Sequence, residues 1–206
     1  MNLQEKATST VFIVDDDEAM RESLTWLIES VGLTVKTFSS ADDFLKAYYP
    51  GRPGCLLLDV RMPGMSGLEL QEYLKKQQVT VPVIMITGHG DVPMAVRAMK
   101  VGAVDFIEKP FNDEQLLESI RNALSIDEER RDDQAFKAEI ASRLALLTPR
   151  ESEVMQMVTD GKSNKEIANT LGVSAKTVEA HRAKVMEKMQ ASSLAELVRL
   201  VVSSHL

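Results

Sequence analysis

Groups suited to phosphoryl chemistry stand at the ends of four short apolar segments. Three consecutive aspartates, at positions 15, 16 and 17, directly follow Val-Phe-Ile-Val, and Asp59 directly follows Cys-Leu-Leu-Leu. Thr87 and Lys109 stand at the ends of two later segments. An aspartate can accept a phosphoryl group when a lysine, a hydroxyl and a metal-binding carboxylate lie beside it. These residue types therefore indicate a phosphoryl-binding site at the ends of these segments.

A predicted parallel β-sheet positions these groups. Apolar, β-branched segments alternate with segments of helical period that begin at capping residues. The predicted strands span residues 11–14, 33–38, 55–58, 83–87 and 104–107. Such alternation is typical of a doubly wound α/β fold, in which helices cover both faces of a parallel sheet. We predict five parallel strands in the flavodoxin-like order 2-1-3-4-5. Proteins with this order bind ligands beyond the carboxyl ends of the strands, at the point where the strand order reverses.

Carboxylates from the first and third strands are expected to meet at this edge. They are Asp15, Asp16 and Asp59. Carboxylates that converge repel one another unless a cation joins them. Mg²⁺ binds one or two carboxylates together with water and phosphate oxygens, so we predict a magnesium site, with Mn²⁺ as a second candidate. Taken alone, the run of three aspartates fits a solvated loop equally well.

Longer motifs strengthen the phosphoryl interpretation. The segments VDDDEAMRESL, LLLDVRMPGMSGLEL and VIMITGHGDVPMAVRAMKVGAVDFIEKPF together resemble the receiver domain of two-component response regulators, over residues 10–123. The resemblance implies that Asp59 accepts its phosphoryl group from a sensor histidine kinase. The implied metal ligands are Asp15, Asp16, Asp59 and the backbone carbonyl of Arg61. The implied phosphoryl-binding and switch residues are Thr87, Lys109 and Phe106, and the Lys109–Pro110 bond is expected to be cis.

The middle of the chain is predicted to be a helical linker. Residues 127–134 contain no apolar residue, glycine or proline, and apolar residues then recur at helical spacing at Phe136, Ile140, Leu144 and Leu147. We therefore divide the chain into a receiver domain at 1–125, a helical linker at 126–146 and a C-terminal domain at 147–206. A partly frayed, solvated spacer is the alternative for the linker.

Charge is distributed unevenly along the chain. The total is −7, but residues 141–206 carry nine basic and seven acidic side chains, whereas residues 1–125 carry 12 basic and 18 acidic ones. Any nucleic-acid contact is therefore expected in the C-terminal third. No segment is apolar enough for a membrane helix, no signal peptide is recognisable, and the single Cys55 fits a reducing compartment. We expect a cytoplasmic protein without a membrane partner.

The C-terminal third is predicted to form four short helices. They begin at capping residues Thr148, Ser163, Ser174 and Ser193, and a Leu-Gly-Val-Ser turn lies between the second and third helices, as in a helix-turn-helix. At 100° per residue, the predicted helix 175–189 buries Val178, Val185 and Met189 and has an opposite face of small and charged side chains. That face suits a DNA major groove. A plain solvated helix face is the alternative.

This region also has a recognisable motif. The segment TPRESEVMQMVTDGKSNKEIANTLGVSAKTVEAHRAKVMEKM resembles the LuxR/FixJ-type helix-turn-helix, over residues 147 to about 202. The implied phosphate contacts are Lys176, Thr177, Lys184 and Lys188. The implied base-facing residues are Glu179, Arg182 and Ala183. Together the two resemblances imply a FixJ/NarL-class response regulator, a DNA-binding transcription factor that is switched by phosphorylation of Asp59 and is not a metabolic enzyme.

Such a regulator is expected to have several partners. They are the sensor histidine kinase, two-fold double-stranded DNA, RNA polymerase and a second copy of the chain. The last helix, with apolar residues between 194 and 202, suits a dimer contact, although packing inside its own domain is the alternative. Two rival functions stay open: a magnesium-dependent phosphatase with an aspartyl-phosphate intermediate, and an interaction module whose C-terminal part binds protein or RNA.

Overall fold

The computed structural model describes residues 9–88 and 90–204 of the chain, which divides into two compact units, Met1–Arg130 and Arg131–Leu206. Each unit has its own buried apolar core. Among the described residues, no helix has both the length and the apolar character needed to span a lipid bilayer. The two units are described in turn.

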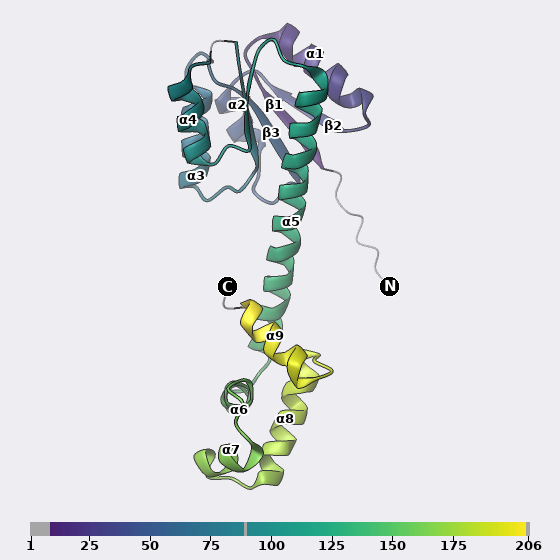
Figure 1. The fold of residues 1–206 in the computed structure, drawn as a ribbon, viewed down its shortest axis with the longest axis vertical. Coiled ribbons are helices and arrows are strands. Elements are labelled where there is room, and N and C mark those ends of the chain that lie inside the picture. The colour runs from purple at the N-terminus through teal and green to yellow at the C-terminus, as the bar shows by residue number, and fades with distance from the viewer. Residues whose placement is uncertain (1–8, 89, 205–206) are drawn as a thin grey trace. The chain divides into compact units, whose positions relative to one another are not determined.

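The N-terminal unit contains a parallel sheet in the order β2-β1-β3-β4-β5, which confirms the predicted order. Figure 1 labels β1, β2 and β3 of this sheet. Its strands are β1 (Thr10–Val14), β2 (Thr34–Phe38), β3 (Gly54–Asp59), β4 (Val83–Thr87) and β5 (Asp105–Glu108). Every residue of β1, β3 and β4 is buried, because helices cover both faces of the sheet. The fifth strand was predicted one residue too early, at 104–107, and the second begins at Thr34 rather than at residue 33.

Alternate strand residues face two separate cores. Phe12, Leu56 and Met85 pack under α2 (Ala41–Ala47), α3 (Gly67–Lys76) and α4 (Val92–Val101). Ile13 and Leu57 pack on the opposite face, under α1 (Glu18–Ser30) and the first part of α5 (Asp113–Ala145). Val14 of β1 stands beside Leu58 of β3 in the ladder. Asp15 and Asp59, which follow these two residues, therefore emerge side by side at the carboxyl edge.

Capping residues begin the helices as the sequence predicts. Asp17 accepts hydrogen bonds from the first turn of α1, and Asp91 does the same for α4. Ser66 and Glu69 form a complete capping box at the start of α3. The Lys109–Pro110 peptide is cis, as the resemblance implied.

The helix α5 is continuous from Asp113 to Ala145, so a frayed spacer between residues 126 and 146 is not observed. Asp127, from the segment without apolar residues, is only 6% exposed, and its Oδ2 accepts a hydrogen bond of 2.9 Å from the backbone N–H of Gly54. Arg130 donates to the carbonyl of Thr80 at 3.1 Å. These bonds attach α5 to the sheet beyond residue 125, and the first compact unit accordingly extends to Arg130.

The C-terminal unit consists of the end of α5 and the helices α6 (Pro149–Thr159), α7 (Asn164–Leu171), α8 (Ala175–Met189) and α9 (Leu194–Ser204). Their apolar residues form one core that includes Ile140, Val154 and Ile167. Thr148 and Ser163 begin α6 and α7 with complete capping boxes. Gly172, in the left-handed region at φ 65°, ends α7 and permits the tight turn into α8.

Candidate functional site

Three charged side chains meet at the carboxyl edge of the sheet. The Nζ of Lys109 lies 2.8 Å from Oδ2 of Asp15 and 2.9 Å from Oδ1 of Asp59. Asp15 is 3% exposed and Asp59 is 7% exposed. Lys109 follows β5, Asp15 follows β1 and Asp59 ends β3. The fold therefore brings these predicted site residues together from separate parts of the sequence. We call this group, with Thr87, the acceptor edge.

Burial and charge act in opposite directions at the acceptor edge. Burial raises the pKa of Asp59, and the hydrogen bond and charge of Lys109 only partly offset that rise. Burial by itself would lower the pKa of Lys109, but its hydrogen bonds to Asp15 and Asp59 outweigh burial and raise this pKa. The ammonium therefore stays charged at neutral pH between the two carboxylates. The other oxygen of Asp59, Oδ2, accepts a hydrogen bond of 2.7 Å from the backbone N–H of Arg61.

The three aspartates after β1 have different surroundings. Asp15 is buried, and its Oδ1 accepts a hydrogen bond of 2.9 Å from the N–H of Asp17. The side chain of Asp17 turns to α1 and accepts from the N–H of Ala19 at 3.0 Å. Asp16, between them, is exposed. The run is therefore not a uniform solvated loop, because one member lies inside the acceptor edge and another caps a helix.

The donor atoms at this edge suit magnesium. Within the described residues, no three His, Cys, Asp or Glu side chains are already grouped as a metal site. Two carboxylates nevertheless converge on a single cationic atom, the Nζ of Lys109, and both are buried. Mg²⁺ needs only one or two carboxylates when water and phosphate oxygens complete its coordination. The oxygen donors of Asp15 and Asp59 fit this requirement.

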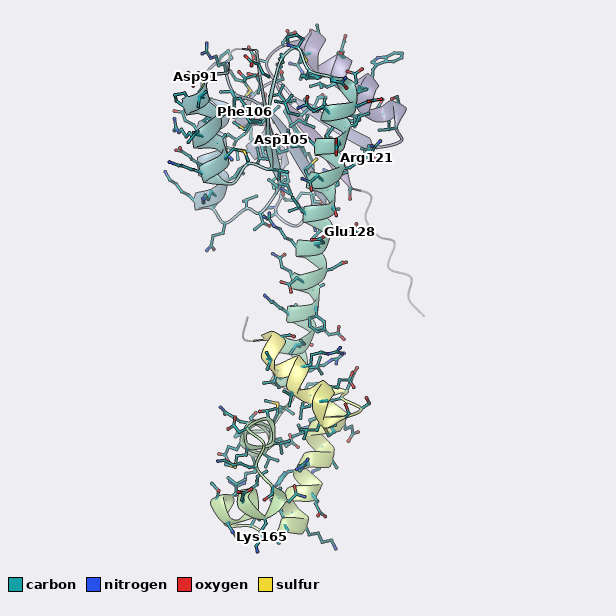
Figure 2. All side chains as sticks on the ribbon, viewed as in Figure 1. Asp91, Asp105, Phe106, Arg121, Glu128 and Lys165 are labelled. Carbon is teal, nitrogen blue, oxygen red and sulfur yellow. The ribbon has the colours of Figure 1, made fainter. Side chains whose placement is uncertain are left out.

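Thr87 and Phe106 lie next to each other beside the β4–α4 connection. Thr87 is buried at the end of β4. Phe106, labelled beside Asp105 on β5 in Figure 2, is partly buried and packs against the core beneath α2, α3 and α4. A Cβ added to Gly90 would lie 3.0 Å from Cε1 of Phe106 and 3.1 Å from Cγ2 of Thr87. The loop backbone therefore packs closely on both predicted switch residues.

Gly67 supports the acceptor strand, and the sequence interpretation did not assign it a role. It is the first residue of α3, and a Cβ added there would lie 2.1 Å from the backbone oxygen of Asp59. Its N–H donates to the carbonyl of Val60 at 3.0 Å. The glycine thus allows α3 to begin directly against the residue that carries the acceptor. Its position beside the capping residue Ser66 was the only available signal.

In the C-terminal unit, α8 has the two faces that the sequence predicts. Val178, Val185 and Met189 are buried in the core. The opposite face is exposed, and its members are Lys176, Thr177, Glu179, Ala180, Ala183, Lys184 and Glu187. The short side chains of Ala180 and Ala183 leave room for a binding partner to approach the helix closely between the charged residues of this face. This exposed set is called the outer face of α8.

Two predicted DNA contacts are not on the outer face. Arg182 is partly buried, and its Nη1 donates to Oδ1 of Asn164 at 2.7 Å. Lys188 is partly buried, and its Nζ lies 2.6 Å from Oε2 of Glu151 and 3.0 Å from the carbonyl oxygen of Leu146. Both cations are hydrogen-bonded within the unit, and the helical wheel gave no sign of these bonds.

Comparison with known proteins identifies two families in the chain. Residues 11–121 match the family described as the response regulator receiver domain, and residues 145–201 match bacterial regulatory proteins of the luxR family. The chain belongs to the response regulators. It is 49% identical to the transcriptional regulatory protein FixJ of Bradyrhizobium diazoefficiens over 93% of this chain and 94% of that protein. It is also 44% identical to the transcriptional regulatory protein TdiR of Thauera aromatica, over 96% and 88% of the two chains.

Solved structures support the same assignment. A low-resolution structure of the response regulator StyR matches with a TM-score of 0.89 and 46% identity, over 95% of this chain and 99% of that one. This response regulator therefore combines a receiver domain with a LuxR-type DNA-binding domain, as its two sequence motifs predicted. The similar relatives named above are transcriptional regulatory proteins.

Proposed function

We propose that Asp59 accepts a phosphoryl group from the phosphohistidine of a sensor kinase. In this transfer the P–N bond to the histidine breaks and a P–O bond to Asp59 forms. The observation that carries the proposal is the ammonium of Lys109, held between the buried carboxylates of Asp15 and Asp59. An ammonium in that position can turn to an oxygen of an arriving phosphoryl group, and the hydroxyl of Thr87 can contact another.

The proposed metal ligands are Asp15, Asp16, Asp59 and the backbone carbonyl of Arg61. Bound Mg²⁺, or Mn²⁺ in its place, supplies positive charge to the phosphoryl oxygens. Lys109 contributes a second positive charge from the chain itself. The chemistry stays on this protein, as phosphoryl transfer to Asp59 and later hydrolysis of the aspartyl phosphate.

The outer face of α8 is the proposed contact with double-stranded DNA. Lys176, Thr177 and Lys184 are exposed and can contact phosphates, while Glu179 and Ala183 can face base edges. Phosphorylation of Asp59 is proposed to favour a homodimer that binds a two-fold promoter site in the cytoplasm and acts on RNA polymerase. Exposed apolar side chains support a dimer, with Leu194 43% exposed and Val202 54% exposed on α9.

Mass measurement of the intact chain tests the acceptor. Acetyl phosphate with Mg²⁺ should add one phosphoryl group to the wild type and none to Asp59→Asn. Asp42→Asn is a matched control, because Asp42 is an exposed carboxylate on α2 and its variant should be labelled like the wild type. Equal labelling of Asp59→Asn and the wild type would show that another residue is the acceptor.

A gel-shift comparison tests the C-terminal role. The phosphorylated chain should bind duplex DNA more tightly than RNA of the same sequence, because the outer face of α8 suits the wide major groove of DNA. Preference for RNA would assign the C-terminal unit a different function.

A further inference from the structure

Two cations of α8 that are not part of its outer face are both bound within the C-terminal unit. Arg182 bonds to Asn164 on α7, and Lys188 bonds to Glu151 on α6. One bond therefore joins α8 to each of its two neighbouring helices. This arrangement differs from that of Lys176 and Lys184, which are exposed on the outer face.

Arg182 is oriented by polar and apolar contacts together. Its Nη1 donates to the first residue of α7, Asn164, at 2.7 Å. The side chain of Arg182 also lines a small apolar cavity with Val154, Val158 and Leu197. An arginine stem that packs on apolar residues while its guanidinium binds a neighbouring helix contributes to packing as well as to charge. To reach a base edge with Nη1, this side chain would have to give up its hydrogen bond to Asn164.

Lys188 pairs with a carboxylate that is itself almost wholly buried. Glu151 is 3% exposed, and its Oε2 accepts from the N–H of Thr148 at 2.8 Å as well as from Nζ of Lys188 at 2.6 Å. The hydrogen bond from Lys188 is the main cause that lowers the pKa of Glu151 to about 2. If Lys188 turned to a DNA phosphate, it would leave a buried carboxylate without its cation, which is strongly unfavourable. The start of α6 depends on the same carboxylate.

We propose that Arg182 and Lys188 are positioning residues that hold α8 against α7 and α6, and that they do not contact DNA. Phosphate contacts of α8 are then made by Lys176 and Lys184. This assignment rests on the DNA-binding role proposed above and narrows the residues that perform it. It replaces the roles that the family resemblance implied for Arg182 and Lys188.

Binding of the full chain to sheared genomic duplex DNA across a salt series separates positioning from contact. Loss of one phosphate contact lowers the slope of log affinity against log salt by about 1. Lys184→Ala should show that change in slope. Lys188→Met should bind several-fold more weakly at every salt concentration with nearly the wild-type slope. Lys188→Arg, which can still donate to Glu151, should recover wild-type affinity.

The Arg182–Asn164 pair is tested by a double-mutant cycle. Arg182→Met retains an apolar stem, and Asn164→Ala removes the acceptor. Each single variant should lower the melting midpoint of the C-terminal unit by about 5 °C or more. The melting of this unit is followed in the full chain through the NMR signals of residues in the unit. The double variant should lose little more than either single variant, because the two residues act as one unit. Both single variants should keep the wild-type salt slope.

Two results would overturn the assignment. One is a salt slope that falls as much in Lys188→Met, whose side chain was the implied phosphate contact, as in Lys184→Ala, with the melting midpoint unchanged. The other is strict additivity of Arg182→Met and Asn164→Ala in the melting midpoint. If even the wild type fails to bind duplex DNA, the DNA-binding role fails on its own. The double-mutant cycle of Arg182 and Asn164 then still decides whether Arg182 positions α8. The melting midpoints of Lys188→Met and Lys188→Arg decide the same for Lys188.

Discussion

The acceptor edge of the sheet and the outer face of α8 use charged side chains in opposite ways. At the acceptor edge, Asp15 and Asp59 are buried and bound to Lys109 before any ligand arrives. On α8 the residues suited to DNA are exposed, and the bound cations, Arg182 and Lys188, are not part of the outer face. At the acceptor edge, the charged residues that are bound to each other therefore belong to the reacting site. In the C-terminal unit, the charged residues that are bound to neighbouring helices support α8.

The difference follows from the ligands that the two regions meet. A phosphoryl group is small and needs a few groups at fixed distances, which burial and backbone packing can provide. A DNA duplex is large and carries a continuous row of phosphates, so exposed cations on a well-oriented helix suffice. The side chains and backbone contacts that support each region can therefore be altered separately.

Backbone packing at the acceptor edge is tested by Gly67→Ala. The added Cβ would lie 2.1 Å from the backbone oxygen of Asp59 and 3.0 Å from Cγ of Leu58, so the start of α3 has to move. Overpacking of this kind costs about 1–3 kcal/mol of unfolding free energy or more, and labelling by acetyl phosphate should slow as well. Gly88→Ala is the control, because a Cβ there meets nothing within 4 Å. Equal unfolding free energies for the two variants would contradict the packing account.

The different roles of Asp16 and Asp17 are tested by Asp16→Ala and Asp17→Ala. Asp17 caps α1, so its loss should cost about 1 kcal/mol of stability and leave magnesium affinity almost unchanged. Asp16 is exposed beside the acceptor edge, so its loss should weaken magnesium binding and leave stability nearly unchanged. Magnesium titration and denaturant unfolding measure the two effects. Equal magnesium affinities in the two variants would show that the ligand set is misassigned.

The contribution of the Lys188–Glu151 pair to the stability of the protein should depend on pH. The hydrogen bond from Lys188 is the main cause that lowers the pKa of Glu151 from 4.5 to about 2. A carboxyl group whose pKa is lower in the folded state stabilises the fold fully above its unfolded pKa, and this stabilisation is lost as the pH falls through the folded pKa. Glu151→Gln should therefore be less stable than the wild type above pH 4.5, and the gap should narrow towards pH 2. Urea unfolding at several pH values checks this; a gap independent of pH would contradict it.

The sequence was sufficient to predict the acceptor edge because strand ends are easy to locate. An apolar segment that stops at a charged residue marks a carboxyl edge, and the order 2-1-3-4-5 then brings Asp15 and Asp59 together. The buried stripe of α8 was predictable for a similar reason, because Val178, Val185 and Met189 repeat at helical spacing. The ends of the strands therefore located the acceptor edge, and the period of the apolar residues gave the buried side of α8.

Partners that are distant in the sequence could not be predicted in this way. Asp127 stands in a segment without apolar residues and reads as solvated, yet its carboxylate is buried against the N–H of Gly54. Thr148 was recognisable as a capping residue, but nothing local indicated that Glu151, its partner in the capping box, also pairs with Lys188 on α8. A helical wheel gives the direction of a cation from its own helix and says nothing about acceptors on neighbouring helices. The same limit hid the bond between Arg182 and Asn164.

The central claim is that phosphorylation of Asp59 increases the affinity of the α8 outer face for DNA. The most direct measurement is the affinity of the full chain for sheared genomic duplex DNA at one salt concentration, with and without acetyl phosphate and Mg²⁺, in the wild type and in Asp59→Asn. The account predicts that affinity rises on phosphorylation in the wild type and stays at the unphosphorylated level in Asp59→Asn. An equal rise in both proteins, or no rise in a fully phosphorylated wild type, would contradict it.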